Sequence, residues 1–144
     1  MILWRISEHA ALDGAGGLVV AGRWHSRGRP IVYAAESSAL AMLEVLVHLE
    51  VERPPPAFQL LRIDAPDRIA VETWSGEDVL PDPGETRSWG DAWLAAGRTA
   101  LARVPSAVAP GARNILLNPL HPDAAGIEVV EASRWPWDPR LFAE

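Results

Sequence analysis

The sequence predicts an α+β fold: a mainly antiparallel β-sheet core with a few flanking helices. Three observations predict it. Segments with the period of a strand open the chain, a strongly apolar helix follows, and strand-like segments return on both sides of a second helix. The chain of 144 residues is long enough for one domain with its own core, so we expect a single domain over residues 1–144.

The N-terminal residues predict a strand, a loop and a further short strand. Residues 1–7 alternate between two faces, which predicts a strand with one buried face and turns Arg5 away from the Trp4 side. Residues 10–17 are expected to form a loop, and residues 18–21 a short strand.

Residues 31–50 predict a buried strand that turns directly into a helix. Residues 31–34 form the strand that carries Tyr33, and Ser37 or Ser38 can cap the helix with a hydroxyl. The helix is apolar on nearly every side, so it must be largely buried. Three consecutive prolines at residues 54–56 are expected to end it.

The second half of the chain predicts further strands around one more helix. An acidic segment with prolines and a glycine, residues 76–88, is expected to be a surface loop. Apolar residues at helical spacing predict a helix over residues 91–103, with Gly97 as its weak point. Strands are expected at residues 58–64, 69–73, 104–110, 114–119 and 127–132, before an aromatic, proline-rich tail at residues 134–144.

Composition excludes several classes of function. The net charge of −6 argues against a nucleic-acid partner held by its phosphates. No apolar run is long enough for a membrane span, and the N-terminus lacks the layout of a signal peptide, so we expect a cytoplasmic protein. The absence of cysteine excludes disulfides and thiolate metal sites. Every basic side chain is arginine, which coding bias explains; any phosphate group would have to be bound by arginine.

Glu44 is the most unexpected side chain in the apolar helix. Only Glu44 and His48 interrupt the apolar surface, and their i,i+4 spacing places them in one line on one face. That line is either the single solvated stripe of the helix or a line that faces a cleft. In the second case a glutamate on a buried helix would be rigidly aimed at a ligand.

Other polar residues could complete a ligand site, although each also has an ordinary structural explanation. The loop at residues 22–30 holds three arginines and a tryptophan, and is either a solvated turn or a rim that binds an anion beside an aromatic ring. A buried carboxylate, arginines, aromatic rings and neutral hydrogen-bonding groups together suit a nucleotide. A carboxylate facing a ribose would stabilise the positive charge that develops during glycosidic cleavage. The candidates are Arg5, Arg23, Trp24, Tyr33, Glu44, Ser106 and Asn118.

Metal and hydrolase sites are not supported. The four histidines, His9, His25, His48 and His121, are too scattered for a local metal signature, so no metal is expected. Ser106 lies in a strand context and not at the turn between a strand and a helix, which argues against a nucleophile of the α/β-hydrolase type.

Six segments of the chain carry a resemblance to known proteins: LWRIS, LDGAGGLVVAGRWHSRGRPIVYAAES, ALAMLEVLVHL, GDAWL, VPSAV and NILLNPLHPD. In this order they resemble the RES-domain family of bacterial toxins across nearly the whole chain. The family is named for an arginine, a glutamate and a serine, and its named arginine maps to either Arg5 or Arg23. His25 departs from the pattern, because the family has a small polar residue such as asparagine there.

The resemblance implies an ADP-ribosyltransferase-like fold with a split sheet, and chemistry on NAD+ as substrate. The toxin would cleave NAD+ at the nicotinamide–ribose bond, with water, phosphate or a protein acceptor left open. It implies Glu44 as the catalytic carboxylate, Arg5 and Ser106 as further catalytic residues, and Arg5, Arg23, Tyr33, Ser106 and Asn118 as NAD+ contacts. His48 has no implied catalytic role and would flank the cleft or face solvent.

The resemblance also implies partners. The expected partner is a cognate helix-turn-helix antitoxin, and the complex with it could contain a homodimer of the toxin. A protein could also act as acceptor. Neither membrane binding nor direct nucleic-acid binding is expected. The alternative from another class is a non-enzymatic nucleotide-binding or interaction module of the same fold. A nuclease toxin is disfavoured by the acidic charge and by the lack of a pair of histidines suited to acid–base chemistry.

Overall fold

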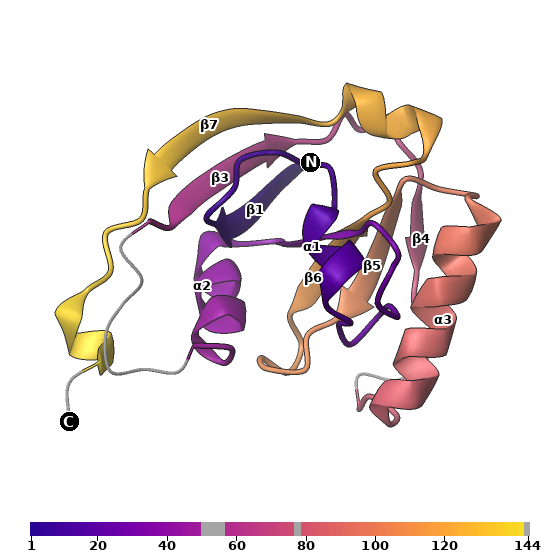
Figure 1. The fold of residues 1–144 in the computed structure, drawn as a ribbon, viewed down its shortest axis with the longest axis horizontal. Coiled ribbons are helices and arrows are strands. Elements are labelled where there is room, and N and C mark those ends of the chain that lie inside the picture. The colour runs from indigo at the N-terminus through magenta and orange to yellow at the C-terminus, as the bar shows by residue number, and fades with distance from the viewer. Residues whose placement is uncertain (50–56, 77–78, 143–144) are drawn as a thin grey trace.

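A seven-stranded sheet organises the computed structural model, which describes residues 1–49, 57–76 and 79–142 (Figure 1). The strand order is β4-β5-β6-β2-β1-β3-β7, and every neighbouring pair is antiparallel except β4 and β5. The α+β class with a mainly antiparallel sheet is therefore confirmed. The strands are β1 (Ile2–Ser7), β2 (Val32–Ala35), β3 (Gln59–Asp64), β4 (Val71–Thr73), β5 (Leu101–Pro105), β6 (Arg113–Leu117) and β7 (Glu128–Arg134).

The sheet divides between β1 and β2. These strands share a single register pair, Trp4 with Ala35, whereas β1 pairs with β3 along its whole length and β2 pairs likewise with β6. The group β4-β5-β6-β2 and the group β1-β3-β7 therefore diverge from this point. A gap between strands leaves backbone groups without ladder partners, so side chains must satisfy them.

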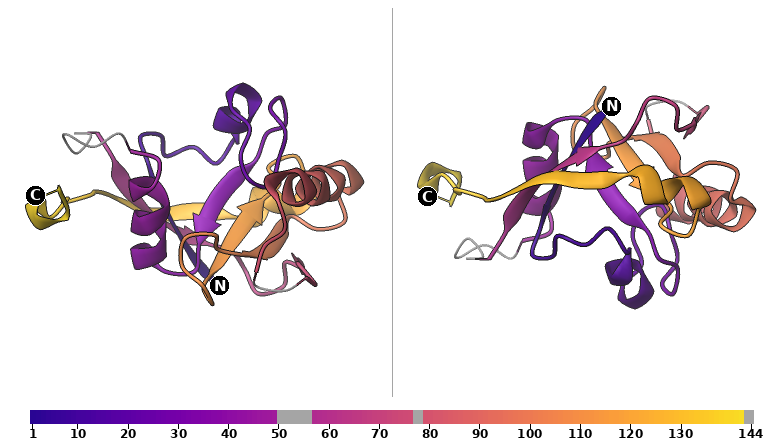
Figure 2. Two further views of the ribbon diagram at one scale, coloured as in Figure 1. Left: turned by 90° about the horizontal axis from the view of Figure 1, so that it is seen from below. Right: turned by 90° about the horizontal axis from the view of Figure 1, so that it is seen from above.

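In the described part of the chain, three α-helices accompany the sheet: α1 (Ala15–Val19), α2 (Ser38–Leu46) and α3 (Pro83–Ala96). Helix α2 packs against β1 and β2, next to the division of the sheet. The Ser37 hydroxyl accepts from the Leu40 N–H at 3.1 Å and caps this helix, as expected. Helices α2 and α3 lie well apart (Figures 1 and 2). Two short 3₁₀ helices, η1 (Pro122–Gly126) and η2 (Pro139–Phe142), flank β7.

Three predicted elements differ from the structure. Residues 15–19 form α1, where a short strand was expected at residues 18–21. Helix α3 begins at Pro83, inside the expected loop 76–88, and ends at Ala96, because the Asp82 carboxylate caps it and Gly97 stops it with φ 61°. Residues 101–105 then form buried strand β5, not the end of a helix. The proline stop at residues 54–56 lies outside the described residues.

The core forms around both parts of the sheet. One cluster, with Leu61, Leu101 and Ile115 fully buried, runs along the sheet, and a second places Ile6, Leu40 and Ala41 between β1 and α2. A third cluster packs α3 against the loop at residues 22–30. No described helix is long and apolar enough to cross a bilayer.

Candidate functional site

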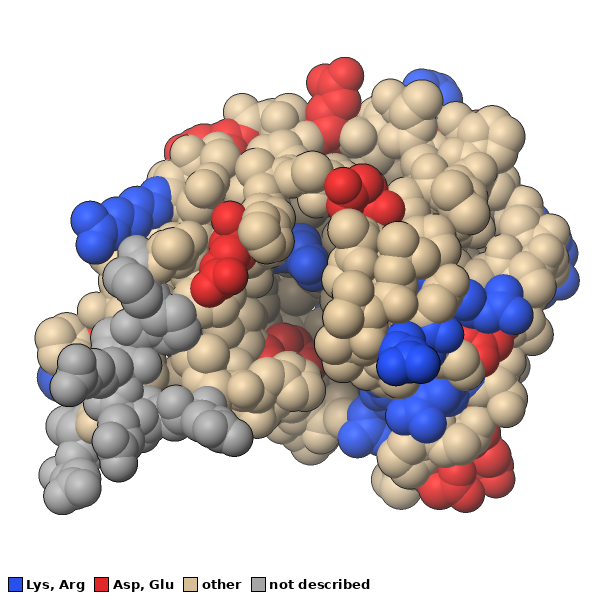
Figure 3. Space-filling view, in the orientation of Figure 1, with Lys and Arg blue, Asp and Glu red and all other residues tan. Residues whose placement is uncertain are grey.

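A cavity of about 850 Å³ opens where β1 and β2 separate, a size in the usual range of ligand pockets. Its walls come from β1, β2, α1 and α2, from the loop that follows α1, and from Asn114 of β6. Figure 3 shows a hollow on this face, with side chains of both charge signs inside it. Among the described residues, the charged side chains that line the cavity, apart from histidines, are Glu44, Arg5, Arg23 and Arg87.

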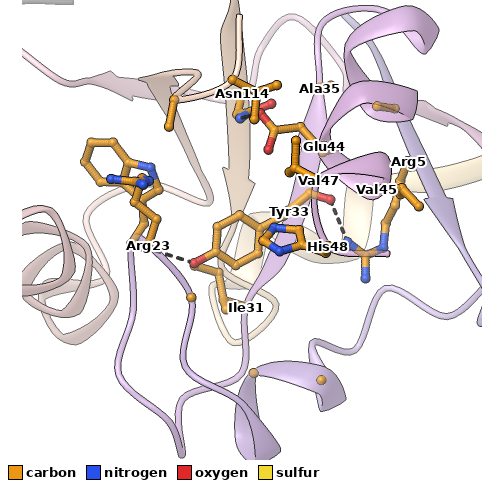
Figure 4. A pocket seen from close by; sticks show the side chains of 18 of the residues that line it. Arg5, Arg23, Ile31, Tyr33, Ala35, Glu44, Val45, Val47, His48 and Asn114 are labelled. Carbon is orange, nitrogen blue, oxygen red and sulfur yellow. Dashed lines mark hydrogen bonds between the residues drawn. The ribbon is translucent and has the colours of Figure 1, made fainter. Parts of the chain in front are cut away.

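Glu44 projects from α2 into this cavity and is held at one oxygen. Its Oε1 accepts a hydrogen bond from Ser106 Oγ at 2.7 Å and another from Asn114 Nδ2 at 2.7 Å. No group in the described part of the chain donates to Oε2. Figure 4 shows the carboxylate turned toward Asn114. The helix line that holds Glu44 and His48 therefore faces the cleft, the second of the two alternatives, although solvent still reaches the carboxylate in part.

Ser106 is buried behind Glu44 and does not line the cavity. Its hydroxyl donates a hydrogen bond to Glu44, and its oxygen accepts from the backbone N–H groups of Val108 and Ala109, both at 3.1 Å. A serine hydroxyl has one donor and two acceptor positions, so all of them are used. The Ser106 hydroxyl therefore orients the carboxylate, and its hydrogen-bonding positions are all occupied by groups of the protein.

Asn114 is a site residue that the sequence reasoning missed. It lies on β6, borders the cavity and holds Glu44 from the sheet side. Its Oδ1 atom is buried and has no hydrogen-bond partner in the described structure, so a ligand donor could satisfy it. The signal in the sequence was an asparagine directly before the apolar residues of the NILL segment.

Arg5 spans the division of the sheet. Its Nη1 donates to the Tyr33 backbone carbonyl at 2.6 Å, which links β1 to β2 where the strand pairing stops (Figure 4). Burial lowers the pKa of the Arg5 guanidinium, and no carboxylate in the described residues forms an ion pair with it. A desolvated cation without a counter-ion favours an anionic ligand.

Two further arginines reach the cavity from the other side. Arg23 is exposed at its rim, and Arg87 of α3 donates from Nε to the Gly22 carbonyl at 3.2 Å. Neither has an ion-pair partner within the described ranges. Arg87 was missed because residues 76–88 were expected to be a surface loop. Arg23 of the arginine-rich turn thus lies at the rim of the cavity, whereas Arg27 and Arg29 do not line it, and anion binding by this turn stays a prediction.

Tyr33 forms a wall of the cavity, and its hydroxyl is buried in the protein. The hydroxyl oxygen lies 2.7 Å from His25 Nδ1 and accepts from the Trp24 N–H at 3.2 Å. Burial raises the pKa of Tyr33 to about 12, so the phenol keeps its proton at neutral pH. Trp24 is 2% exposed and packs in the core cluster, so its ring supports the loop.

Asn118 does not reach the cavity. It is buried just beyond β6, where its Oδ1 accepts from the Leu120 N–H at 3.1 Å and shapes the following turn. His48, by contrast, is exposed at the cavity mouth. Within the described residues, no three His, Cys, Asp or Glu side chains come together as metal ligands would.

The arrangement separates two kinds of chemistry. One end presents a carboxylate whose orientation is fixed by two neutral donors, which suits stabilisation of a developing cation. The arginines line other parts of the same cavity and suit phosphate groups. A ligand that carries both phosphates and a glycosidic carbon fits this distribution.

Known proteins are similar to this chain in sequence. A chain from Pseudomonas putida named "Toxin Res" is 45% identical, and the alignment covers 99% of this chain and 100% of that one. A chain from Sphingobium sp. (strain YBL2), named "Prs ADP-ribosylating toxin", is 39% identical over 96% of this chain and 95% of its own length.

A solved structure shares the fold. The match is to the crystal structure of the M. tuberculosis MbcT-MbcA toxin-antitoxin complex, with a TM-score of 0.76 at 20% identity, and it covers 98% of this chain and 86% of the other. The RES domain family model matches residues 2–138. The resemblance in the sequence is therefore confirmed, and the chain belongs to the RES domain family.

Proposed function

We propose that the protein is the toxin of a toxin–antitoxin pair and that it consumes NAD+ in one domain spanning residues 1–144. The observation that carries this proposal is the Glu44 carboxylate, fixed by Ser106 and Asn114 in a cavity that Arg5, Arg23 and Arg87 also line. The names of the relatives from Pseudomonas and Sphingobium support it.

In the proposed complex, Arg5 binds the pyrophosphate or a ribose, with Arg23 and Arg87 assisting. Arginine suits this role because its planar group donates two hydrogen bonds to one phosphate. Tyr33 walls the nicotinamide, and Glu44 faces the ribose attached to it. Asn118 is left out of this binding model, because it does not line the cavity.

The proposed reaction breaks the bond between the ribose anomeric carbon and the nicotinamide nitrogen. The bonding electrons leave with nicotinamide, which becomes neutral, and the ribose carbon gains oxocarbenium character. The negative charge of Glu44 stabilises that cation in the transition state. The acceptor, either water, phosphate or a protein side chain, then bonds to the same carbon and loses a proton where it carries one. An acceptor on a protein would make the enzyme an ADP-ribosyltransferase.

The proposed partner is an antitoxin encoded with the toxin. The solved structure of similar fold is a toxin–antitoxin complex, which supports a partner of this kind. We further propose that the antitoxin has a helix-turn-helix part and that the complex contains two toxin copies. Size determination of the co-expressed complex by light scattering would test the stoichiometry.

The experiment that tests the activity is release of nicotinamide from NAD+ by purified, folded protein. Reactions with buffer alone, with phosphate and with a cell extract as acceptor source distinguish hydrolysis, phosphorolysis and transfer. Release in any of the three supports the proposal. Saturable NAD+ binding without release in all three would instead assign the chain to a non-enzymatic nucleotide-binding module.

A further inference from the structure

The His25 ring lies between the wall of the cavity and the segment that follows α1. Its side chain is buried, at 2% exposure, and both ring nitrogens have partners. Nδ1 lies 2.7 Å from the Tyr33 hydroxyl, and Nε2 lies 3.0 Å from the Val20 carbonyl oxygen. Val20 and Tyr33 both line the cavity, so this ring joins two of its walls.

The partners fix which nitrogen carries the proton. The Val20 carbonyl can only accept, so Nε2 must carry hydrogen and donate to it. In the neutral ring Nδ1 is then the acceptor, and the Tyr33 hydroxyl donates to it. The Tyr33 oxygen also accepts from the Trp24 N–H, so the hydroxyl is oriented by one acceptor and one donor.

The backbone at two glycines packs closely against this pair. A Cβ atom on Gly22 would lie 2.4 Å from the Tyr33 hydroxyl oxygen and 3.0 Å from His25 Nδ1. A Cβ atom on Gly17 would lie 3.1 Å from His25 Nε2 and 2.4 Å from the Arg29 carbonyl oxygen. Glycine at both positions lets the chain close around the His25 ring.

We propose that His25 is a positioning residue: through its Nδ1 it holds the Tyr33 phenol in the orientation that walls the cavity. This inference deepens the proposed function and rests on it for the ligand, but the His25–Tyr33 contact itself can be measured without any ligand. Burial lowers the pKa of His25, which keeps the ring neutral and Nδ1 available as an acceptor. The charged groups that act on it from α3 are Asp91 and Arg87.

Two amide substitutions separate the two contacts of the ring. In His25→Asn the side-chain oxygen takes the place of Nδ1 and can accept from Tyr33, whereas in His25→Gln the amide nitrogen takes the place of Nε2 and can donate to Val20. His25→Ala removes both contacts. His48→Asn is the matched control, because that histidine lies at the same cavity without a hydrogen bond to Tyr33.

The first measurement needs no substrate. Tyr33 is the single tyrosine of the chain, so a carbon-13 label at tyrosine Cζ gives one resonance that reports on its hydroxyl. We expect this resonance to move in His25→Gln and His25→Ala, and to stay close to the wild-type position in His25→Asn and His48→Asn. A resonance that stays in place in folded His25→Gln would overturn the proposal.

The second measurement uses NAD+ turnover. We expect KM to rise about tenfold in His25→Gln, with kcat within about threefold of wild type, and His25→Asn to restore KM to within about threefold. If the KM of His25→Gln is as close to the wild-type value as that of His25→Asn, the contact with Tyr33 is not needed for binding. The positioning role of His25 is then wrong. If no variant, wild type included, turns over NAD+, the proposed function fails while the resonance still decides the contact. Should the alanine variant not fold, the comparison of Asn with Gln carries the same decision.

Discussion

Ser106 and Asn114 donate to the same oxygen of Glu44, each at 2.7 Å, although they lie 62 and 70 residues further along the chain. Two neutral donors on Oε1 hold the carboxylate without neutralising it. Because the described structure provides no donor to Oε2, that oxygen is the one available to a ligand. The contact therefore fixes both the orientation of Glu44 and the atom that would face the ribose.

Glu44→Gln should lower kcat for nicotinamide release by about 100- to 1000-fold. The amide oxygen can keep both hydrogen bonds from Ser106 and Asn114, so the fold should survive, but the negative charge that stabilises the transition state is lost. The Kd for NAD+, measured by calorimetry, should change less than about fivefold. Full activity in this variant would remove Glu44 from the mechanism.

Ser106→Ala should reduce kcat by about tenfold and leave KM nearly unchanged, because the variant loosens the carboxylate without touching the ligand. It should also lower the free energy of unfolding by about 1–2 kcal/mol, since Val108 and Ala109 lose their acceptor. Denaturant unfolding and steady-state kinetics measure the two effects. Ser133→Ala, on exposed strand β7, is the control and should change neither. A large rise in KM would show that the serine contacts the ligand directly.

Arg5→Lys should lower kcat/KM for NAD+ by about tenfold or more. Lysine cannot donate to the Tyr33 carbonyl and to a phosphate in the fork geometry of a guanidinium. Arg23→Lys should lower it less, by about two- to threefold, because that side chain is exposed at the rim. Arg27→Lys, in the same loop but outside the cavity lining, is the control. A larger effect at Arg23 than at Arg5 would reverse the assignment of the main phosphate ligand.

The local part of the site could be predicted from the sequence, and the long-range part could not. An apolar helix with one glutamate on a cleft-facing line is a local pattern, and it led to Glu44. Asn114 and Ser106 meet that glutamate only because β6 pairs with β2 and β5 pairs with β6, and no spacing in the sequence shows this. Asn118 was the asparagine named as a candidate contact, and the structure places it just beyond β6 and away from the cavity, whereas Asn114, four residues earlier, lies on β6 and lines the cavity.

The errors in the predicted secondary structure around α3 have a shared cause. Prolines and a glycine before residue 85 suggested a loop, yet Asp82 and Pro83 are also the residues that begin a helix, as a cap and a first-turn proline. Gly97 was taken as a weak point within a helix, whereas its left-handed conformation ends one. Arg87 was hidden by the first of these errors.

Alkaline pH should destabilise the protein through Tyr33. Its pKa is raised from 10.0 to about 12 in the folded state, so the unfolded chain loses this proton first. The stability that the protonated phenol contributes is present below pH 10 and is lost as pH rises from 10 to 12, by about 2–3 kcal/mol. The chain has no lysine, no cysteine and no second tyrosine, so Tyr33 is the one side chain of these three types that can titrate in this window. The midpoint of denaturant unfolding should fall between pH 10 and pH 12 in the wild type. In Tyr33→Phe the fall in the midpoint should be smaller.

Gly90→Ala should destabilise the protein by several kcal/mol, because α3 touches the cavity loop at this residue. A Cβ atom there would lie 1.6 Å from the Trp24 carbonyl oxygen and 2.7 Å from the carbonyl carbon, both of which are backbone atoms that cannot turn aside. The helix must then move away from the loop that carries Trp24 and His25. Gly16→Ala is the matched control: its Cβ would meet nothing within 4 Å, so the midpoint of thermal unfolding should stay near the wild-type value. Equal midpoints for the two variants would show that the contact between α3 and the loop is looser than its geometry implies.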